Sequence, residues 1–286
     1  MKIYHLGGKG NFGDFLNLWL WDQVMPDILD EDGCTAFVGI GTLLNQKMVA
    51  QTPDAQKRII FSSGAGYGKR LKNLDESFTV YCVRGPITAR MLNLPLDLAI
   101  ADAGILIRKL YQPSLPKRYK FSYMPHYNFA GEGWRLVCEQ IDFGYIDPCL
   151  PTEEVLDQIS SSEILLTEAM HGAIAADALR VPWIPVINHP IILALKWQDW
   201  CSSMGLYHSP HYIDYLNQPN PKIDPLTPIR QVRDSIRQRK TAKQLLAVAK
   251  SAKPMLSDIN LLDNLVEQLL EKIEILKKDV IAGKFV

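Results

Sequence analysis

Several features that would settle the class of a protein early are missing from this sequence of 286 residues. No run of about 18 apolar residues occurs, so we expect no membrane-spanning helix. The first residues, MKIYHLGG, contain no long apolar stretch, and we therefore expect no secretory signal peptide. The 31 Lys and Arg residues balance 31 Asp and Glu residues. This zero net charge argues against a nucleic-acid partner.

Disulfide, metal and nucleotide signatures are also absent. The cysteines are odd in number, widely spaced and without a C-x-x-C pair; they are Cys34, Cys82, Cys138, Cys149 and Cys201. Reduced thiols of a cytoplasmic protein fit this spacing, whereas a disulfide framework or a zinc site does not. No set of His, Asp or Glu has metal-ligand spacing, so we predict no metal. Neither a G-x-G-x-x-G motif with its acidic residue nor a P-loop motif occurs, which disfavours both kinds of nucleotide site.

The sequence does contain a regular alternation of short apolar segments and helical patterns. Hydrophobic residues make up 47% of the chain, enough for a sizeable core. Near-continuous apolar strands separated by helices are typical of parallel sheets covered on both faces, so we expect an α/β fold. Strands are predicted at KIYHLG, TAFVGI, RIIFSS, FTVYCV and LAIADAG, and then at KFSYMPH, FGYID, EILLTE and PWIPVIN.

A polar stretch divides this alternation in two. Residues 111–119, YQPSLPKRY, contain two prolines and read as a linker. We therefore predict two Rossmann-like domains whose parallel sheets face a cleft, over residues 1–112 and 113–228. A single large sheet is the alternative. Residues 229–286 are predicted to form C-terminal helices, and their segment 230–253 has eight basic residues against one acidic residue.

Glycine-rich turns follow most of the predicted strands. In doubly wound folds, ligands bind beyond the carboxyl ends of the strands. Backbone N–H groups of such turns can approach an anion, and the start of the next helix adds a favourable dipole. Each turn taken alone is more simply explained as a tight connection. The candidate substrate-binding residues at these turns are Asn11, Gly13, Gly41, Thr42, Ser63 and Gly64.

Three charged residues occupy similar positions. Arg84 ends an apolar strand, where a guanidinium can bind a carboxylate or phosphate; a structural ion pair, for example with Asp102, is the alternative. Asp14 follows a glycine-rich turn and either caps the next helix or acts in catalysis. Lys196 lies on the helix after VINHP, where a surface charge is the simpler interpretation and substrate binding the other.

The sharpest signal is His171, at the junction of the strand EILLT and a helix of small residues. An imidazole there can exchange protons near neutral pH, although a histidine can also simply cap the strand end. Glu168 either orients the ring, acts as a second acid–base group, or is a solvated loop charge. His126, after SYMP, is a substrate-binding candidate or a turn residue. Gly172, directly after His171, joins the substrate-binding candidates.

Taken in order, a set of motifs resembles that of the polysaccharide pyruvyl transferases. The motifs are GNFGDFLN, GIGTLLN, FSSGAGYG, VRGPITARML, ADAGIL, MPHYN and TEAMHGAIAADALRVPWIPV, spread over roughly residues 1 to 205. The last block is most similar to the branch that modifies exopolysaccharides of the succinoglycan type. The resemblance implies a GT-B-like fold. It also implies that phosphoenolpyruvate donates a pyruvyl group, which forms a cyclic ketal on two sugar hydroxyls without a cofactor or metal.

The resemblance implies roles for particular residues. His171 is expected to be the general acid of the reaction. The carboxylate and phosphate of the donor require cations and backbone donors. Many family members have an arginine two residues before the histidine, but Ala169 stands there in this sequence. Arg84 and Lys196 are the candidates to replace that arginine.

Two other functions stay open at this stage. One is a GT-B glycosyltransferase that uses a nucleotide-sugar, and the other is a non-catalytic glycan-binding relative. The expected partners are phosphoenolpyruvate and a saccharide acceptor, free or lipid-linked. The sequence fixes neither the acceptor sugar and its linkage nor the oligomeric state, with a homo-oligomer one option.

The C-terminal helices raise a question of localisation. Lipid-linked acceptors, which the resemblance implies, would place a cytoplasmic enzyme at the inner membrane. The basic segment 230–253 borders an apolar edge of Ile229, Val232 and Ile236, which makes peripheral membrane contact one interpretation. A solvated helix that packs back across the domains is the favoured one. The amphipathic helix expected over residues 256–280 reads as a packing or dimer helix.

Overall fold

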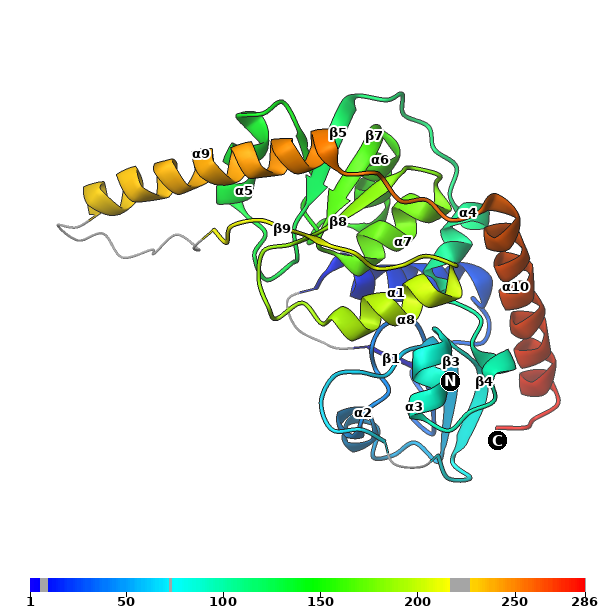
Figure 1. Cartoon of the computed structure of the whole chain (residues 1–286). Coiled ribbons are helices and arrows are strands. Elements are labelled where there is room, and N and C mark those ends of the chain that lie inside the picture. The colour runs from blue at the N-terminus through cyan, green and yellow to red at the C-terminus, as the bar shows by residue number, and fades with distance from the viewer. Residues whose placement is uncertain (6–9, 72–73, 217–226, 286) are drawn as a thin grey trace. The chain divides into compact units, whose positions relative to one another are not determined.

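The computed structural model describes residues 1–5, 10–71, 74–216 and 227–285. The chain forms two compact units of α/β structure, each with its own parallel sheet (Figure 1). Unit 1 consists of Met1–Gln112, Leu193–His208 and Ser257–Val286, and unit 2 consists of Pro113–Ile192 and Ser209–Leu256. Within the described residues, no helix is both long and apolar enough to cross a membrane.

The sheet of unit 1 has four parallel strands in the order β1-β2-β3-β4. The strands are β1 (Lys2–Tyr4), β2 (Thr35–Val38), β3 (Lys57–Ser63) and β4 (Phe78–Val83). Every residue of β2 is buried, as expected for an inner strand of a parallel sheet that is covered on both faces.

Helices supply both covers of this sheet. They are α1 (Phe12–Val24), α2 (Gln46–Gln51), α3 (Pro86–Met91), α4 (Ile107–Leu110), α8 (Ala194–Ser203) and α10 (Ile259–Ile281), with the 3-10 helices η1 (Leu96–Leu98) and η2 (Ala103–Leu106). On one face, the indole of Trp21 in α1 meets Phe37 and Phe61 edge-on, with ring centroids 4.9 and 5.1 Å away. On the other face, Met48 and Ala89 bring α2 and α3 into a second core cluster.

Unit 2 has five parallel strands in the order β6-β5-β7-β8-β9. The strands are β5 (Tyr119–Met124), β6 (Gly144–Tyr145), β7 (Ser162–Thr167), β8 (Trp183–Ile187) and β9 (His211–Tyr212). Numbered within the unit, this is the 2-1-3-4-5 order of one common doubly wound fold. The direction in which the chain adds strands therefore reverses at β5.

The helices of unit 2 lie on opposite faces of its sheet. They are α5 (Glu132–Glu139), α6 (Thr152–Ser160), α7 (Met170–Ala178) and α9 (Thr227–Ser251). Trp134 of α5 and Leu245 of α9 pack with Tyr123 and Leu166 in one core cluster. Helix α7 packs against α6, β7 and β8. A side chain at Gly172 would place its Cβ 2.6 Å from the sulfur of Met124, so α7 approaches the sheet closely there.

The α/β class with two parallel sheets is confirmed, and one predicted strand is wrong. The segment LAIADAG forms only a single bridge, between Ala99 and Val83, and then η2. The reason is local, because the carboxylate of Asp102 accepts the N–H of Gly104 at 3.0 Å and starts the 3-10 helix. The short strand β9 was not among the strands predicted from the sequence.

The compact units differ from the contiguous stretches expected from the sequence. Helix α8 belongs to unit 1 because Asp199 binds the start of α3. Helix α9 belongs to unit 2, where it packs on α5, and α10 packs on η2 and β4 of unit 1. The chain therefore passes between the two units four times, after residues 112, 192, 208 and 256.

Candidate functional site

Unit 2 places its predicted site residues where the strand order reverses. Helices α5 and α7, which follow β5 and β7, cover opposite faces of the sheet, so the loops after these strands diverge. In doubly wound sheets, such a divergence is the usual ligand site. His126 follows β5, and Glu168 and His171 follow β7. Asn188, at the end of β8, completes this group, which we call the unit 2 site.

Glu168 ties the ends of three strands together. Its Oε2 accepts the backbone N–H of His126 at 3.0 Å and the amide of Asn188 at 3.1 Å. Its Oε1 accepts the backbone N–H of Asn188 at 2.7 Å, and its own N–H donates to Met124 at 3.0 Å. The side chain is fully buried. The interpretation of Glu168 as a solvated loop charge is therefore wrong, and the geometry favours a positioning role.

Burial also changes the acidity of this group. It raises the pKa of Glu168 to about 7, and the N–H donors of His126 and Asn188 offset part of this rise. No ion pair with a cation is formed by Glu168 in the described part of the chain. Its carboxyl group is thus close to half-protonated at neutral pH, while its hydrogen bonds fix the loops on both sides of the sheet's switch point.

His171 is the second residue of α7 and is half-buried. This helix has no side-chain cap, because Ala169 stands at its N-cap position. The first turn of a helix carries the positive end of the helix dipole, which attracts anions, and the imidazole of His171 belongs to this first turn. Gly172 serves the close packing of α7 on Met124, as described above, which explains this glycine without a ligand.

Aromatic rings gather around His126, a feature that sequence analysis missed. The imidazole is 8% exposed and lies 4.7 Å from the ring of Tyr127 and 5.8 Å from that of Phe129. Phe129 in turn lies 4.9 Å from His189 and 5.4 Å from Tyr215. We call these five rings the aromatic rim. Its members come from loops that follow three different strands, which no local sequence pattern reveals.

Arg84 of unit 1 forms a buried ion pair. Its Nε donates to Asp199 at 3.0 Å, and its Nη1 donates to Thr42 at 2.8 Å. The remaining contacts of the guanidinium are to the carbonyl groups of Gly41 and Ala65, each at 3.5 Å. Both charged side chains are fully buried. The partner is thus Asp199 and not Asp102, and the geometry favours a structural role for Arg84; its role in donor binding stays a prediction.

Asp199 also holds the start of α3. One carboxylate oxygen accepts the N–H groups of Ile87 and Thr88, both at 2.9 Å, and the other accepts the Thr88 hydroxyl at 2.6 Å. It therefore caps a helix that lacks a capping side chain of its own. Sequence analysis missed Asp199. The signal was its place between Trp197 and Trp200, because an acid between two tryptophans of one helix indicates a buried carboxylate.

The predicted glycine-rich turns of unit 1 meet at Arg84. A Cβ added to Gly64 would lie 2.1 Å from the guanidinium carbon, so the arginine packs directly on the glycine. Gly41 has a φ of +119°, which favours glycine. The hydroxyl of Ser63 and the N–H of Gly64 both donate to the carbonyl of Gly41, at 3.3 and 2.8 Å. The turns of Gly41 and Gly64 meet at Arg84, and their packing accounts for these two glycines; their role in substrate binding stays a prediction.

Lys196, one turn before Asp199 on α8, has a different environment. Its ammonium lies 5.7 Å from the ring of Tyr67 and forms no ion pair among the described residues. Burial, and to a smaller extent the charge of Arg84, lower the pKa of Lys196 to about 8. The side chain is half-buried, so it is not an ordinary exposed surface charge. It is the best candidate in unit 1 for binding an anion.

The first helix of unit 1 begins at Asn11. The side-chain oxygen of Asn11 accepts the N–H groups of Gly13 and Asp14 at 3.0 and 3.4 Å. Its amide donates to the carboxylate of Asp14 at 2.5 Å. The interpretation of Asp14 as the N-cap is therefore wrong, because Asn11 is the cap. Roles of Asn11 and Gly13 in substrate binding, and of Asp14 in catalysis, stay predictions.

Comparisons with known proteins identify the family. The family model for polysaccharide pyruvyl transferase matches residues 11–190. The chain is 37% identical over 217 residues to the succinoglycan biosynthesis protein ExoV of Rhizobium meliloti (strain 1021), which covers 74% of this chain and 68% of that protein. A crystal structure of a functionally uncharacterised protein from Klebsiella pneumoniae is 15% identical, covers 66% of this chain and 84% of its own, and has a TM-score of 0.41, too low to carry an argument. The resemblance found in the sequence is confirmed, and this chain belongs to the polysaccharide pyruvyl transferase family.

Proposed function

We propose that this protein transfers a pyruvyl group from phosphoenolpyruvate to two hydroxyls of a saccharide in exopolysaccharide biosynthesis. Family membership and the similarity to ExoV support pyruvyl transfer. The observation that carries the proposal is the unit 2 site. The matched segment ends just beyond β8 and includes His126, Glu168 and His171, which the fold gathers at the switch point of one sheet.

The reaction needs a proton donor and a proton acceptor. C3 of the enol receives a proton and becomes a methyl group, which makes C2 electrophilic. A sugar hydroxyl attacks C2 and loses its proton, the C2–O bond to phosphate breaks, and a second hydroxyl closes the ketal with loss of another proton. His171 is the group that delivers the first proton, because an imidazole can do so near neutral pH. Glu168 keeps the neighbouring loops in place.

The donor also needs anion-binding groups. The start of α7 places the positive end of a helix dipole beside His171, close to Ala169, which stands where the resemblance implies an arginine. Lys196 of unit 1 is the second candidate. The proposal includes the GT-B-like arrangement that the resemblance implies, in which the carboxyl ends of both sheets line one cleft.

The acceptor is proposed to be a saccharide, free or lipid-linked, that the enzyme modifies on the cytoplasmic side of the membrane. The aromatic rim supports this choice, because the apolar faces of sugar rings pack on aromatic rings. Tyr127 is 38% exposed, and Phe129, His189 and Tyr215 are half-buried, so part of the rim stays accessible.

The test is an assay with phosphoenolpyruvate and a bacterial exopolysaccharide oligomer from which pyruvate has been removed. We expect phosphate release only when both are present, together with a ketal methyl signal in the proton NMR spectrum of the product. Release that requires a nucleotide-sugar instead would show a glycosyltransferase. Intact glycan binding without any turnover would show a non-catalytic relative. A folded His171→Ala variant serves as the negative control.

A further inference from the structure

Helix α9 has one face that packing explains and one that packing does not. Its C-terminal half enters the core of unit 2 through Ala242, Leu245 and Ala249, which are at most 5% exposed. Its N-terminal half extends beyond α5 (Figure 1). The fold therefore accounts for the inner face of α9 and leaves the composition of its outer face to be explained.

The outer face carries an aliphatic strip. Ile229, Val232 and Ile236 are 67, 62 and 63% exposed. Their spacing of three and four residues places them along one edge of the helix. Single exposed aliphatic residues are ordinary, but three on one edge form a continuous apolar surface. We call these three residues the α9 strip.

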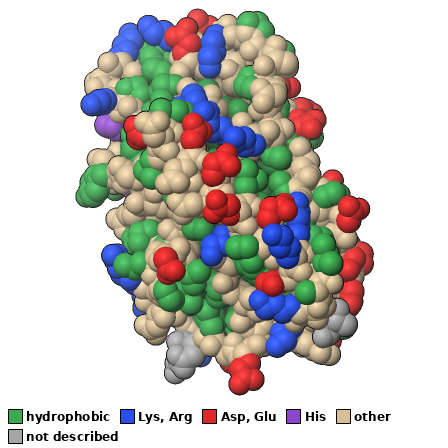
Figure 2. Space-filling model, turned by 90° about the vertical axis from the view of Figure 1, so that its right-hand side faces the viewer, with side chains coloured by type: hydrophobic (Ala, Val, Ile, Leu, Met, Phe, Trp, Pro, Cys, Tyr) green, Lys and Arg blue, Asp and Glu red, His purple; other side chains and the backbone are tan. Residues whose placement is uncertain are grey.

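Basic side chains border the α9 strip on both sides. At about 100° per residue, Arg239 falls on one border, and Lys240 and then Arg233 fall on the other, with Arg237 farther round the helix. The exposed face of α10 is different, because it mixes acidic and basic residues, and Lys277 pairs there with Glu274 at 2.9 Å. Figure 2 shows such a mixture of acidic and basic side chains on one face of the molecule. Of these two C-terminal helices, α9 is the one that carries an exposed aliphatic strip with basic borders.

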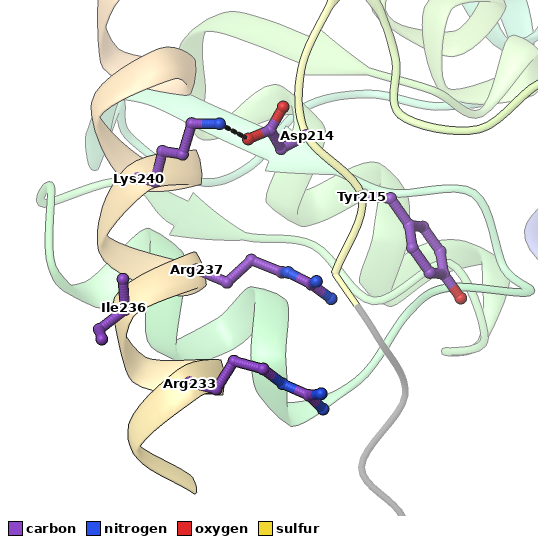
Figure 3. Close-up of a pocket in the computed structure, with 6 residues that line it drawn as sticks. All are labelled: Asp214, Tyr215, Arg233, Ile236, Arg237 and Lys240. Carbon is purple, nitrogen blue, oxygen red and sulfur yellow. Dashed lines mark ion pairs between the residues drawn. The ribbon is translucent and has the colours of Figure 1, made fainter. Parts of the chain in front are cut away.

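A hollow adjoins the strip. Its volume is about 490 Å³, and it is lined by Asp214, Tyr215, Arg233, Ile236, Arg237 and Lys240. Lys240 forms an ion pair with Asp214 at 2.6 Å, and Arg233 forms a longer one with its neighbour Asp234 at 3.7 Å. The guanidinium groups of Arg233 and Arg237 extend toward the chain segment of Tyr215, while Ile236 lies on the other side of the helix (Figure 3). Two forked cations beside an apolar edge suit a phosphate group that is attached to a lipid.

We propose that the outer face of α9 binds the surface of an anionic membrane. The α9 strip enters the boundary between headgroups and acyl chains, and Arg233 and Arg237 bind headgroup phosphates. Charge complementarity favours an anionic membrane. Its acyl chains match the apolar α9 strip, and its phosphates match the basic residues on the borders of the strip. The proposal does not depend on catalysis, so vesicle binding and pyruvyl transfer can fail independently of each other.

The test is sedimentation of the full chain with vesicles of phosphatidylglycerol and phosphatidylcholine at low salt, with pure phosphatidylcholine as the neutral surface. We expect binding to the anionic vesicles alone. The double variant Arg233→Gln and Arg237→Gln should bind about 30-fold more weakly, because each basic residue contributes about 1 kcal/mol near such a surface. The triple variant Ile229→Ser, Val232→Ser and Ile236→Ser should bind at least about 10-fold more weakly.

Matched controls remove the same chemistry from other exposed positions. Lys47→Gln with Lys120→Gln removes two charges, and Leu96→Ser, Leu115→Ser and Ile281→Ser remove three exposed aliphatic residues. Both controls should bind like the wild type, and circular dichroism confirms that all variants keep their helices. The proposal is overturned if the wild type ignores anionic vesicles, or if a control loses as much binding as its matched variant. A third outcome also overturns the proposal. If soluble glycerol 3-phosphate releases the protein from vesicles and the triple serine variant still binds them, the hollow is a site for soluble phosphates and the α9 strip plays no part.

Discussion

Both units bury a charged side chain at the carboxyl edge of a parallel sheet, but they satisfy it in opposite ways. In unit 1, the cation Arg84 meets the carboxylate of Asp199, so the pair is neutral as a whole. In unit 2, the carboxyl of Glu168 meets neutral hydrogen-bond donors and no cation among the described residues, and burial raises its pKa to about 7. The first arrangement locks α8 and α3 together. The second fixes loops while leaving a group that titrates in the physiological range.

This difference separates a structural role from a functional one. A buried guanidinium that is paired with a carboxylate and donates to three further oxygens has little capacity left for a ligand. In unit 2, in contrast, His171 lies in the first turn of α7, and Ala169 gives this helix no side-chain cap. The neighbouring loops are fixed by Glu168. We therefore expect substitutions at the unit 2 site to lower turnover, and substitutions at Arg84 or Asp199 to lower the free energy of unfolding.

The largest effect is expected from Asp199→Ala. The change leaves Arg84 buried without its partner and removes the cap of α3, so we expect the free energy of unfolding to fall by about 3–5 kcal/mol. The control is Asp263→Ala, which breaks the partly exposed pair with Arg108 and should cost less than about 1 kcal/mol. Urea unfolding of both variants measures the difference. Equal losses would contradict the assignment of Asp199 as a buried structural anchor.

The second effect concerns pH. Between about pH 4.5 and 7, folded chains hold a proton on Glu168 that unfolded chains have lost. The contribution of this group to the free energy of unfolding is therefore complete at low pH and falls as pH rises, on the order of 3 kcal/mol over this window. Glu168→Gln removes the titration, so the difference between wild type and variant should change with pH in this window only. A difference that does not vary with pH would refute the raised pKa.

The third effect separates turnover from folding at His171. We expect His171→Ala to lower kcat on the order of 10²-fold, because a positioned acid–base group is lost, and to leave the free energy of unfolding nearly unchanged. His211→Ala, which changes another half-buried histidine of unit 2, is the control and should keep near wild-type kcat. Near wild-type turnover in a folded His171→Ala protein would remove His171 from the mechanism.

The smallest effect tests which cation binds the donor. Lys196→Gln should raise the KM for phosphoenolpyruvate about 10-fold, as expected for loss of one charge-assisted hydrogen bond. Because the pKa of Lys196 is lowered to about 8, the wild-type KM should also rise from pH 7 to pH 9, whereas that of the variant should not. Lys109→Gln, at an exposed ion pair with Glu267, is the control. If Arg84→Lys changes KM without loss of stability, the anchor is Arg84 after all.

The sequence predicted the residue positions that depend on strand order and missed the contacts that depend on distant partners. His126, Glu168 and His171 were predictable because each follows an apolar strand, and parallel strands end at one edge. Arg84 and Asp199 pair although they are 115 positions apart in the sequence. The residues next to either one do not indicate its partner. The burial of Glu168 was equally hidden, because its hydrogen-bond donors come from two other loops.

The repeated passage of the chain between the units has a consequence for biosynthesis. Unit 2 is complete in sequence once residue 256 has been made, whereas unit 1 still lacks α10 at that point. Until then, the buried residues of α10 cannot cover their part of unit 1; these are Leu262, Leu265, Val266, Leu269, Ile273 and Leu276. The unit that begins first during translation is therefore the one that finishes last. On the ribosome, unit 1 must keep an apolar surface open while unit 2 folds.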